Sequence, residues 1–150
     1  MSTQSARICD DDRLTRAIRV YEQLSPTTLD ALESLFAPDA HFIDPFNDVI
    51  GRATIRKIFE HMYATLDQPR FDVLEGAIQG CNGFLLWDLH FRSRGQTHRI
   101  HGMSRLVFDD QGRITLHHDH WDPARQLYEG VPVLGALMRM IRRRLSATGS

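Results

Sequence analysis

The spacing of hydrophobic residues changes once along the chain, from helical periodicity to strict alternation, and this change restricts the fold. From residue 71 onward, alternating apolar and polar residues occupy 71–79, 84–93, 96–108 and 112–122. Turn residues such as Arg94-Gly95 separate these segments, so they are expected to be successive antiparallel strands. Because helical spacing comes first, the sequence predicts an α+β fold with helices covering one face of a curved sheet.

Three helices are expected before this sheet. The first follows the acidic residues 10–12 and carries Tyr21 on its apolar face. The second begins at Ser25-Pro26, with the serine as cap and the proline at the first helical position. The third begins after Gly51, carries Phe59 on its apolar face and ends at Gln68-Pro69, and residues 40–44 should form a short strand before it.

Size and charge narrow the class of protein. A chain of 150 residues with 42% hydrophobic and 25% charged residues should form a single domain over 1–150, with residues 1–9 flexible. A net charge of −1, with no arginine-rich run between aromatic residues, argues against nucleic-acid binding. The sequence has no apolar run long enough for a signal peptide or a membrane span, so a cytoplasmic protein is expected. Cys9 and Cys81 are interpreted as reduced thiols.

The last predicted strand, GRITLHHDHWDP at 112–123, has ionisable residues on both faces. Alternation assigns one face to Ile114, Leu116, His118 and His120, and the other to Thr115, His117, Asp119 and Trp121. Since an unpaired charge within a core is costly, such a strand suits the wall of a pocket better than a plain core. His118 and His120 are expected to contact a helix or a dimer partner.

The run DAHFIDPFNDVIGRATIRKIF at 39–59, preceded by LESLFAPDA, resembles the nuclear transport factor 2-like superfamily, in particular its SnoaL-like and ketosteroid isomerase-like members. The resemblance extends over about residues 13–122. It implies a cone: a curved antiparallel or mixed sheet wrapped around a cavity and packed by three N-terminal helices. It specifies the fold more than the activity, because this superfamily includes enzymes, binding proteins and assembly modules.

The resemblance also implies site residues. Matching to ketosteroid isomerases puts Asp44 at the general-base aspartate, Tyr21 near the tyrosine that donates to the oxyanion, and Ser104 where those enzymes have a protonated aspartate. A serine is a weaker acid there, so steroid isomerisation is not expected. Likeness to SnoaL-type polyketide cyclases gives Asp119 the role of the acid/base aspartate. The implied cavity residues are Trp87, Leu89, Phe91, Leu106, His117, Asp119 and Trp121, and Phe59 is a further predicted ligand contact.

Each of these polar residues has an alternative interpretation. Asp44 is either a desolvated base with a raised pKa or the cap of an Asp-Pro turn. Asp119 is either a pocket acid or the partner of His101, His117 or an arginine in a buried network. Tyr21 could be a core residue with a satisfied hydroxyl. His101 and Ser104, one strand away, could complete a relay with His117 and Asp119.

Neither a metal nor a cofactor is expected. His101, His117 and Asp119 form a conceivable metal site, but the chain lacks the usual zinc-binding helix signature. Residues 124–150 are predicted to be a helical extension, in which Pro132 opens an amphipathic helix with four arginines after Gly130. One interpretation is that this helix covers the cavity or packs in a homodimer, and the other is that it contacts a membrane surface. The first interpretation is favoured.

Two functions follow from these observations. The first is a cofactor-independent isomerase, cyclase or dehydratase acting on a small hydrophobic carbonyl compound. In it, Asp44 or Asp119 moves a proton, and Tyr21, Ser104 or His117 stabilises the enolate oxygen. The second is a non-catalytic module that binds a lipid-like ligand or another protein.

Overall fold

The computed structural model describes residues 10–127, and the expectations for residues 1–9 and for the helix from Pro132 lie outside this range. The elements in chain order are α1 (Asp12–Glu22), α2 (Ala31–Leu35), β1 (Phe36–Ile43), β2 (Asp48–Ile50), α3 (Arg52–Thr65), β3 (Asp67–Gln79), β4 (Asn82–Ser93), β5 (Gln96–Phe108), β6 (Ile114–His120) and α4 (Pro123–Leu127). Within this range, no helix is long and apolar enough to cross a membrane.

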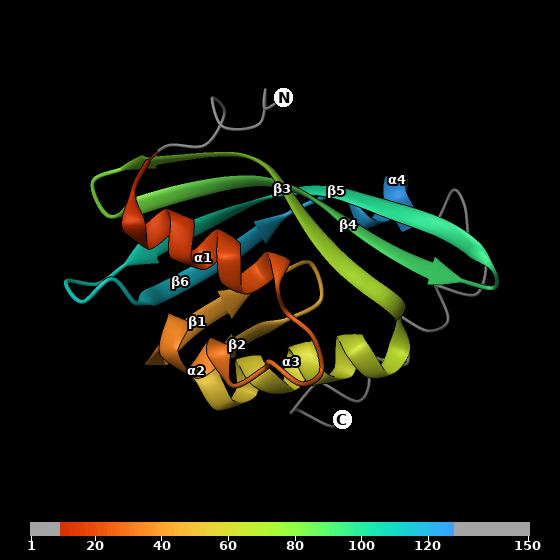
Figure 1. Ribbon diagram of the computed structural model, residues 1–150, viewed down its shortest axis with the longest axis horizontal. Coiled ribbons are helices and arrows are strands. Elements are labelled where there is room, and N and C mark those ends of the chain that lie inside the picture. Colours follow the sequence, from red (N-terminus) through yellow and green to blue (C-terminus); the bar gives the residue numbers. More distant parts are fainter. Residues whose placement is uncertain (1–9, 128–150) are drawn as a thin grey trace.

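The strands form one curved, mixed sheet, which confirms the predicted α+β cone. Their order is β2-β1-β6-β5-β4-β3, with β1 parallel to β6 and the other neighbours antiparallel. Helices α1 and α3 lie against the same side of the sheet, where they contact β3, and α3 also contacts β1 (Figure 1). The space between the sheet and these helices contains the core.

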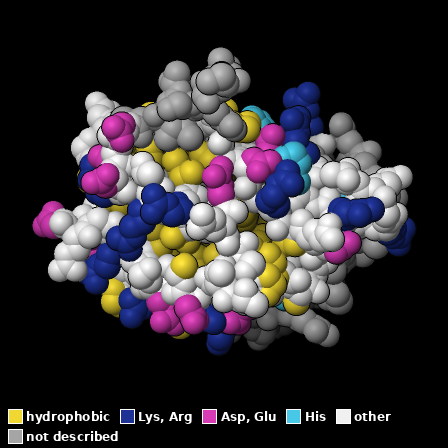
Figure 2. Space-filling view, in the orientation of Figure 1, with side chains coloured by type: hydrophobic (Ala, Val, Ile, Leu, Met, Phe, Trp, Pro, Cys, Tyr) yellow, Lys and Arg dark blue, Asp and Glu magenta, His cyan; other side chains and the backbone are white. Residues whose placement is uncertain are grey.

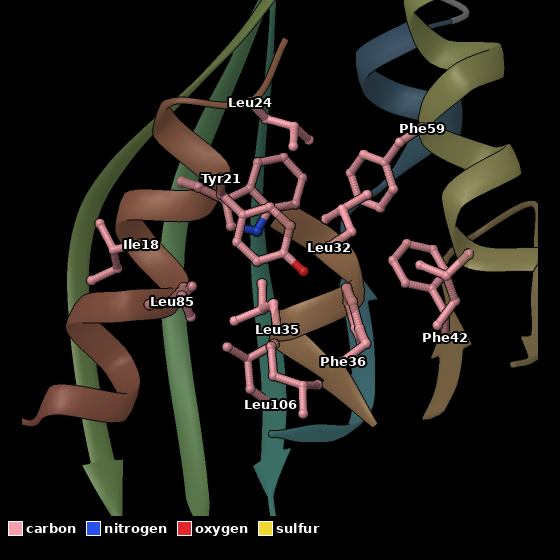
Figure 3. Close-up of a cluster of buried hydrophobic side chains, with 14 of the residues drawn as sticks. Ile18, Tyr21, Leu24, Leu32, Leu35, Phe36, Phe42, Phe59, Leu85 and Leu106 are labelled. Atoms are coloured by element: carbon pink, nitrogen blue, oxygen red, sulfur yellow. The ribbon is translucent and has the colours of Figure 1, made fainter. Parts of the chain in front are cut away.

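The first helix begins and packs as its sequence predicts. The Asp11 side chain accepts a hydrogen bond from the backbone N–H of Arg13 at 2.9 Å and so caps the N-terminus. The buried face includes Leu14, Ile18 and Tyr21. Figure 3 shows Tyr21 of α1 beside Phe59 of α3, and their ring centroids are 6.1 Å apart. These contacts fix α1 and α3 relative to each other.

The second helix is shorter than predicted. Ser25-Pro26 does not begin it: residues 25–30 form turns held by hydrogen bonds among the hydroxyls of Ser25, Thr27 and Thr28, and the helix covers only Ala31–Leu35. Serine and threonine side chains compete with helical hydrogen bonding in this way.

Two strands include prolines that were predicted to lie outside them. β1 begins at Phe36 and includes Pro38, and β3 begins at Asp67 and includes Pro69. In both places the strand pairing is interrupted, between Phe36 and His41 in one and between Asp67 and Arg70 in the other, so a missing N–H breaks no ladder.

An irregularity changes which residues of β6 face the core. Phe108 pairs with Ile114 but Val107 pairs with Leu116, so Thr115 is an extra residue. Ile114 is therefore fully buried on the same face as His117, and the predicted strict alternation from Ile114 to Trp121 is wrong at its first two residues. In β4 the alternation holds, because Trp87, Leu89 and Phe91 are all buried.

Candidate functional site

A cavity of about 160 Å³ lies between the sheet and the helices. Its walls are mostly aromatic and aliphatic, and the aromatic residues are Tyr21, Phe42, Phe46, Phe59, Phe71, Trp87, Phe91 and Trp121. The polar lining residues are Asp44, Asn47, His61, Thr65, Ser104, His117 and Asp119. On the face in Figure 2, apolar side chains lie in recesses between charged and polar ones. A mostly apolar pocket with a few convergent polar groups is typical of small-molecule sites.

The register of β5 and β6 brings two of the predicted polar residues together. Ser104 pairs with Asp119, and Leu106 pairs with His117, so the inward side chains of the two strands are neighbours. On the other side of β5, Trp87 of β4 pairs with Gly102. A Cβ atom at Gly102 would lie 2.5 Å from Cη2 of Trp87, so only glycine leaves room for the indole ring in this position.

Five side chains form a continuous hydrogen-bonded series along the cavity wall. Trp87 Nε1 donates to Ser104 Oγ at 2.7 Å, and Ser104 donates in turn to Oδ1 of Asp119. The same Oδ1 lies 2.6 Å from His117 Nε2, and His117 Nδ1 lies 2.7 Å from the hydroxyl of Tyr21. Side chains from α1, β4, β5 and β6 therefore converge on one carboxylate.

The geometry favours one arrangement of protons in this series. If Asp119 is ionised, it accepts from both Ser104 and His117, which places a hydrogen on His117 Nε2. His117 Nδ1 is then the acceptor for the Tyr21 hydroxyl, and with a neutral imidazole every donor in the series has an acceptor. Oδ2 of Asp119 receives no hydrogen bond from any residue that the structure describes.

His117 and Tyr21 of this hydrogen-bonded series are buried, which favours their neutral forms. His117 is stacked on Phe42, with ring centroids 4.7 Å apart, and its side chain is 5% exposed. Burial, and next the negative charge of Asp119, raise the pKa of Tyr21 well above its ordinary value. Tyr21 therefore stays a neutral hydrogen-bond donor over the whole physiological range.

Asp44 combines both interpretations of its sequence context. Its Oδ1 accepts hydrogen bonds from the backbone N–H groups of Phe46 and Asn47, each at 2.7 Å, and its two oxygens accept from Asn47 Nδ2. It is thus the cap of the turn between β1 and β2 and also part of the cavity wall. Burial, which outweighs these hydrogen bonds, raises the pKa of Asp44, and the charge of Asp119 adds to the rise.

Two of the predicted ligand contacts lie outside the cavity. Leu106 is fully buried in the core but does not line the cavity. His101 lies on the outer face, where its Nδ1 is 2.6 Å from Oδ1 of Asp88, and it cannot join a relay or a metal site with His117 and Asp119. Residues 101 and 104 are three apart on one strand, so their side chains point to opposite faces.

The outer face of the sheet has its own polar contacts. Gln126 of α4 bonds both the N–H and the C=O of His101, which holds α4 against β5. His118 and His120 lie with ring centroids 4.0 Å apart, and burial followed by the nearby His120 lowers the pKa of His118. Among the described residues, no group of histidine, cysteine or acidic side chains is arranged to hold a metal ion.

Some residues of the cavity were not singled out by sequence reasoning. Phe71 and His61 line it, and the resemblance that pointed to Asp44 and Asp119 carried no motif for them. Helical spacing was the available signal for His61, which follows Ile58 by three residues and precedes Thr65 by four, and all three line the cavity. His61 Nε2 is buried and has no hydrogen-bond partner among the residues that the structure describes.

Solved structures with the same fold have low sequence identity to this chain. A hypothetical protein from Catenulispora acidiphila with a ketosteroid isomerase-like fold, in complex with trimethylamine, has a TM-score of 0.70 and 17% identity over 83% of this chain and 96% of that one. A putative SnoaL-like polyketide cyclase from Shewanella putrefaciens has a TM-score of 0.66 and 18% identity, covering 79% and 98% of the two chains. An LEH-like epoxide hydrolase from M. tuberculosis has a TM-score of 0.64 and 17% identity, covering 85% and 96%.

Sequence comparison gives the family directly. No curated protein matches the chain. The family model described as the SnoaL-like domain matches residues 17–117, which run from the middle of α1 to the middle of β6 and include Tyr21, Asp44, Ser104 and His117. The chain therefore belongs to the SnoaL-like domain family.

Proposed function

We propose that the cavity binds a small, largely apolar molecule and that Asp119 transfers a proton to or from it without a cofactor. The observation that carries this proposal is the series from Trp87 to Tyr21, which directs two hydrogen bonds to Oδ1 of Asp119, a residue of the cavity wall, and leaves Oδ2 without a hydrogen bond from any described residue. A carboxylate held in one orientation within an apolar cavity is suited to general acid/base catalysis.

The other members of the series position Asp119 in this proposal. The Ser104 and Tyr21 hydroxyls donate within the series, and His117 donates to the carboxylate, so none of them needs to touch the substrate. Asp44 is the second carboxyl group of the cavity; burial raises its pKa, and in the proposal it donates to a substrate oxygen when it is protonated. When two carboxyl groups in one site have different pKa values, one commonly acts as the acid and the other as the base.

The reaction class that fits is removal of a proton beside a carbonyl group, as in an isomerase, cyclase or dehydratase. Oδ2 of Asp119 takes the proton from carbon, the electron pair moves to the carbonyl oxygen, and Asp44 donates to that oxygen. The volume of about 160 Å³ is suited to a substrate of roughly one ring, since a cavity of about 150 Å³ holds benzene. Homodimer formation remains a prediction.

Proton exchange of cyclohexanone in heavy water, followed by NMR, tests this proposal without knowledge of the natural substrate. The wild-type protein should accelerate loss of the α-proton signal, and Asp119→Asn should slow it by about a hundredfold or more, because positioned general bases contribute at least that much. The control is Asp72→Asn, the same substitution on the outer side of β3, where Asp72 pairs with Arg70 and His90.

A non-catalytic binding module is the second candidate, and one observation favours it: every donor in the series already has an acceptor inside the protein. The chain has two tryptophans, Trp87 and Trp121, and both line the cavity, so intrinsic fluorescence reports on binding there. Fluorescence quenching by cyclohexanone with no acceleration of exchange would favour the binding module over the enzyme.

A further inference from the structure

The charged side chains that line the cavity, among the described residues, are all acidic. Among the described residues that line it, two are aspartates, Asp44 and Asp119, and none is a lysine or an arginine. Burial raises the pKa of Asp44 and the charge of Asp119 adds to the rise, so the two carboxyl groups are close enough to repel each other. Among the residues that the structure describes, the walls thus carry negative charge with no permanent positive charge beside it.

His117 does not offset this charge in the proton arrangement that satisfies the series. Its Nε2–H donates to Asp119 and its Nδ1 accepts from Tyr21, which requires a neutral ring. An ionised carboxylate in an apolar cavity is costly unless it is paired. A ligand that carries a positive charge would supply the missing partner.

The aromatic walls favour the same kind of ligand. The rings of Phe46 and Trp121 meet edge to face with centroids 5.5 Å apart, and those of Phe71 and Trp87 do so at 6.0 Å. Both pairs line the cavity. The face of an aromatic ring attracts cations, most strongly for tryptophan, and groups of such rings are the usual way in which proteins bind alkylated ammonium groups.

From the two cavity aspartates with no lysine or arginine among the described lining residues, the aromatic walls and the volume of about 160 Å³, we propose that this cavity selects a small organic cation, an ammonium group with short alkyl substituents. An anion of the same shape would meet two carboxyl groups and the negative faces of the rings. The inference rests on the proposed function only in that both need the cavity to be a ligand site. It identifies the charge of the ligand, which the proton-transfer proposal does not.

Three probes of nearly the same shape test the proposal: choline, the neutral 3,3-dimethylbutan-1-ol and the anionic 3,3-dimethylbutanoate. Quenching of Trp87 and Trp121 fluorescence gives each dissociation constant in the full-length protein. Choline should bind at least about tenfold more tightly than the alcohol, and the carboxylate most weakly, as expected for a desolvated cation beside a carboxylate and aromatic rings. Affinity for the alcohol equal to or greater than that for choline would overturn the inference and leave the proposed function intact.

Charge-removing variants locate the effect. Asp119→Asn should reduce the preference for choline over the alcohol by several-fold, and Asp72→Asn should leave the preference unchanged. A preference that persists in the doubly substituted Asp44→Asn, Asp119→Asn protein, shown to be folded by circular dichroism, would contradict the proposal. Absence of quenching by all three probes would overturn this inference together with the binding part of the proposed function.

Discussion

His117 Nε2 and Asp119 Oδ1 lie 2.6 Å apart although the two residues are separated by a full step of β6 on the same face. Tyr21 bonds to the other ring nitrogen of His117, and Ser104 donates to the same oxygen of Asp119 that His117 contacts. The imidazole therefore donates to the carboxylate from within the core, while the carboxylate reaches the cavity. This pair connects the core of the protein to its proposed chemistry.

Tyr21→Phe should destabilise the protein. It removes the hydroxyl that bonds to Nδ1 of the buried His117 and leaves that nitrogen unsatisfied, which costs about 1–3 kcal/mol. Urea denaturation measures the change in the free energy of unfolding. Tyr63→Phe is the matched control, because the Tyr63 hydroxyl bonds to no residue that the structure describes, and its effect should stay within about 0.5 kcal/mol. Equal effects of the two variants would contradict a structural role for the Tyr21 hydroxyl.

The ionisation of Tyr21 should depend on Asp119. Its pKa is raised by burial first and by the Asp119 charge second, so Asp119→Asn should lower the pKa of Tyr21 while leaving it above the ordinary value. Because the folded-state pKa is the higher one, the stability contribution of Tyr21 is complete below the unfolded pKa and is lost as pH rises through the folded pKa. Carbon NMR of the Tyr21 ring measures the titration, and an unchanged midpoint in the variant would show that Asp119 is not ionised beside it.

The stability of the protein should change with pH through Asp44. Its pKa is raised, chiefly by burial, so its contribution is present below the ordinary aspartate pKa and is lost as pH rises through the folded-state value. Asp44→Asn cannot titrate but keeps an oxygen for the N–H groups of Phe46 and Asn47. Its stability relative to wild type should therefore increase as the pH is raised from acid to neutral.

Urea denaturation at acidic and neutral pH measures this difference. Asp110→Asn, in the exposed turn between β5 and β6, controls for the loss of one negative charge. Asp44→Ala should instead cost about 1–3 kcal/mol at both pH values, because the two backbone N–H groups lose their acceptor. A difference between Asp44→Asn and wild type that does not vary with pH would refute the raised pKa.

Gly102→Ala should disturb Trp87. The added Cβ would lie 2.5 Å from the indole ring, which must move and so weaken the hydrogen bond from Nε1 to Ser104. Overpacking of this kind costs about 1–3 kcal/mol, measurable by urea denaturation, and should also change the near-ultraviolet circular dichroism of the tryptophans. In the control Gly76→Ala, the nearest atom is the flexible Cδ2 of Leu14 at 3.2 Å, so a smaller effect is expected. A Gly102→Ala protein as stable as wild type would mean that Trp87 has room to shift.

Local sequence predicted the elements better than their boundaries. The β4 and β5 strands and the face of α1 that carries Tyr21 follow from periodicity and capping, because each depends on neighbours within a few residues. Ser25-Pro26 was misread because its hydroxyls satisfy one another within a turn, an outcome that a helical cap signature does not distinguish. Pro38 and Pro69 were placed outside strands because the interruptions in pairing that accommodate them depend on the partner strand.

The candidate site shows the same division between local and tertiary information. Sequence alone determined that β6 carries ionisable residues on a core-facing side, and the family resemblance pointed to Asp44, Asp119, Tyr21 and Ser104. Only the tertiary structure decided that Thr115 is an extra residue, that His101 faces outward, and that five side chains from four elements form one hydrogen-bonded series through Asp119. Alternation is fixed by backbone geometry within one strand, whereas strand register and the docking of α1 depend on contacts between residues distant in the chain.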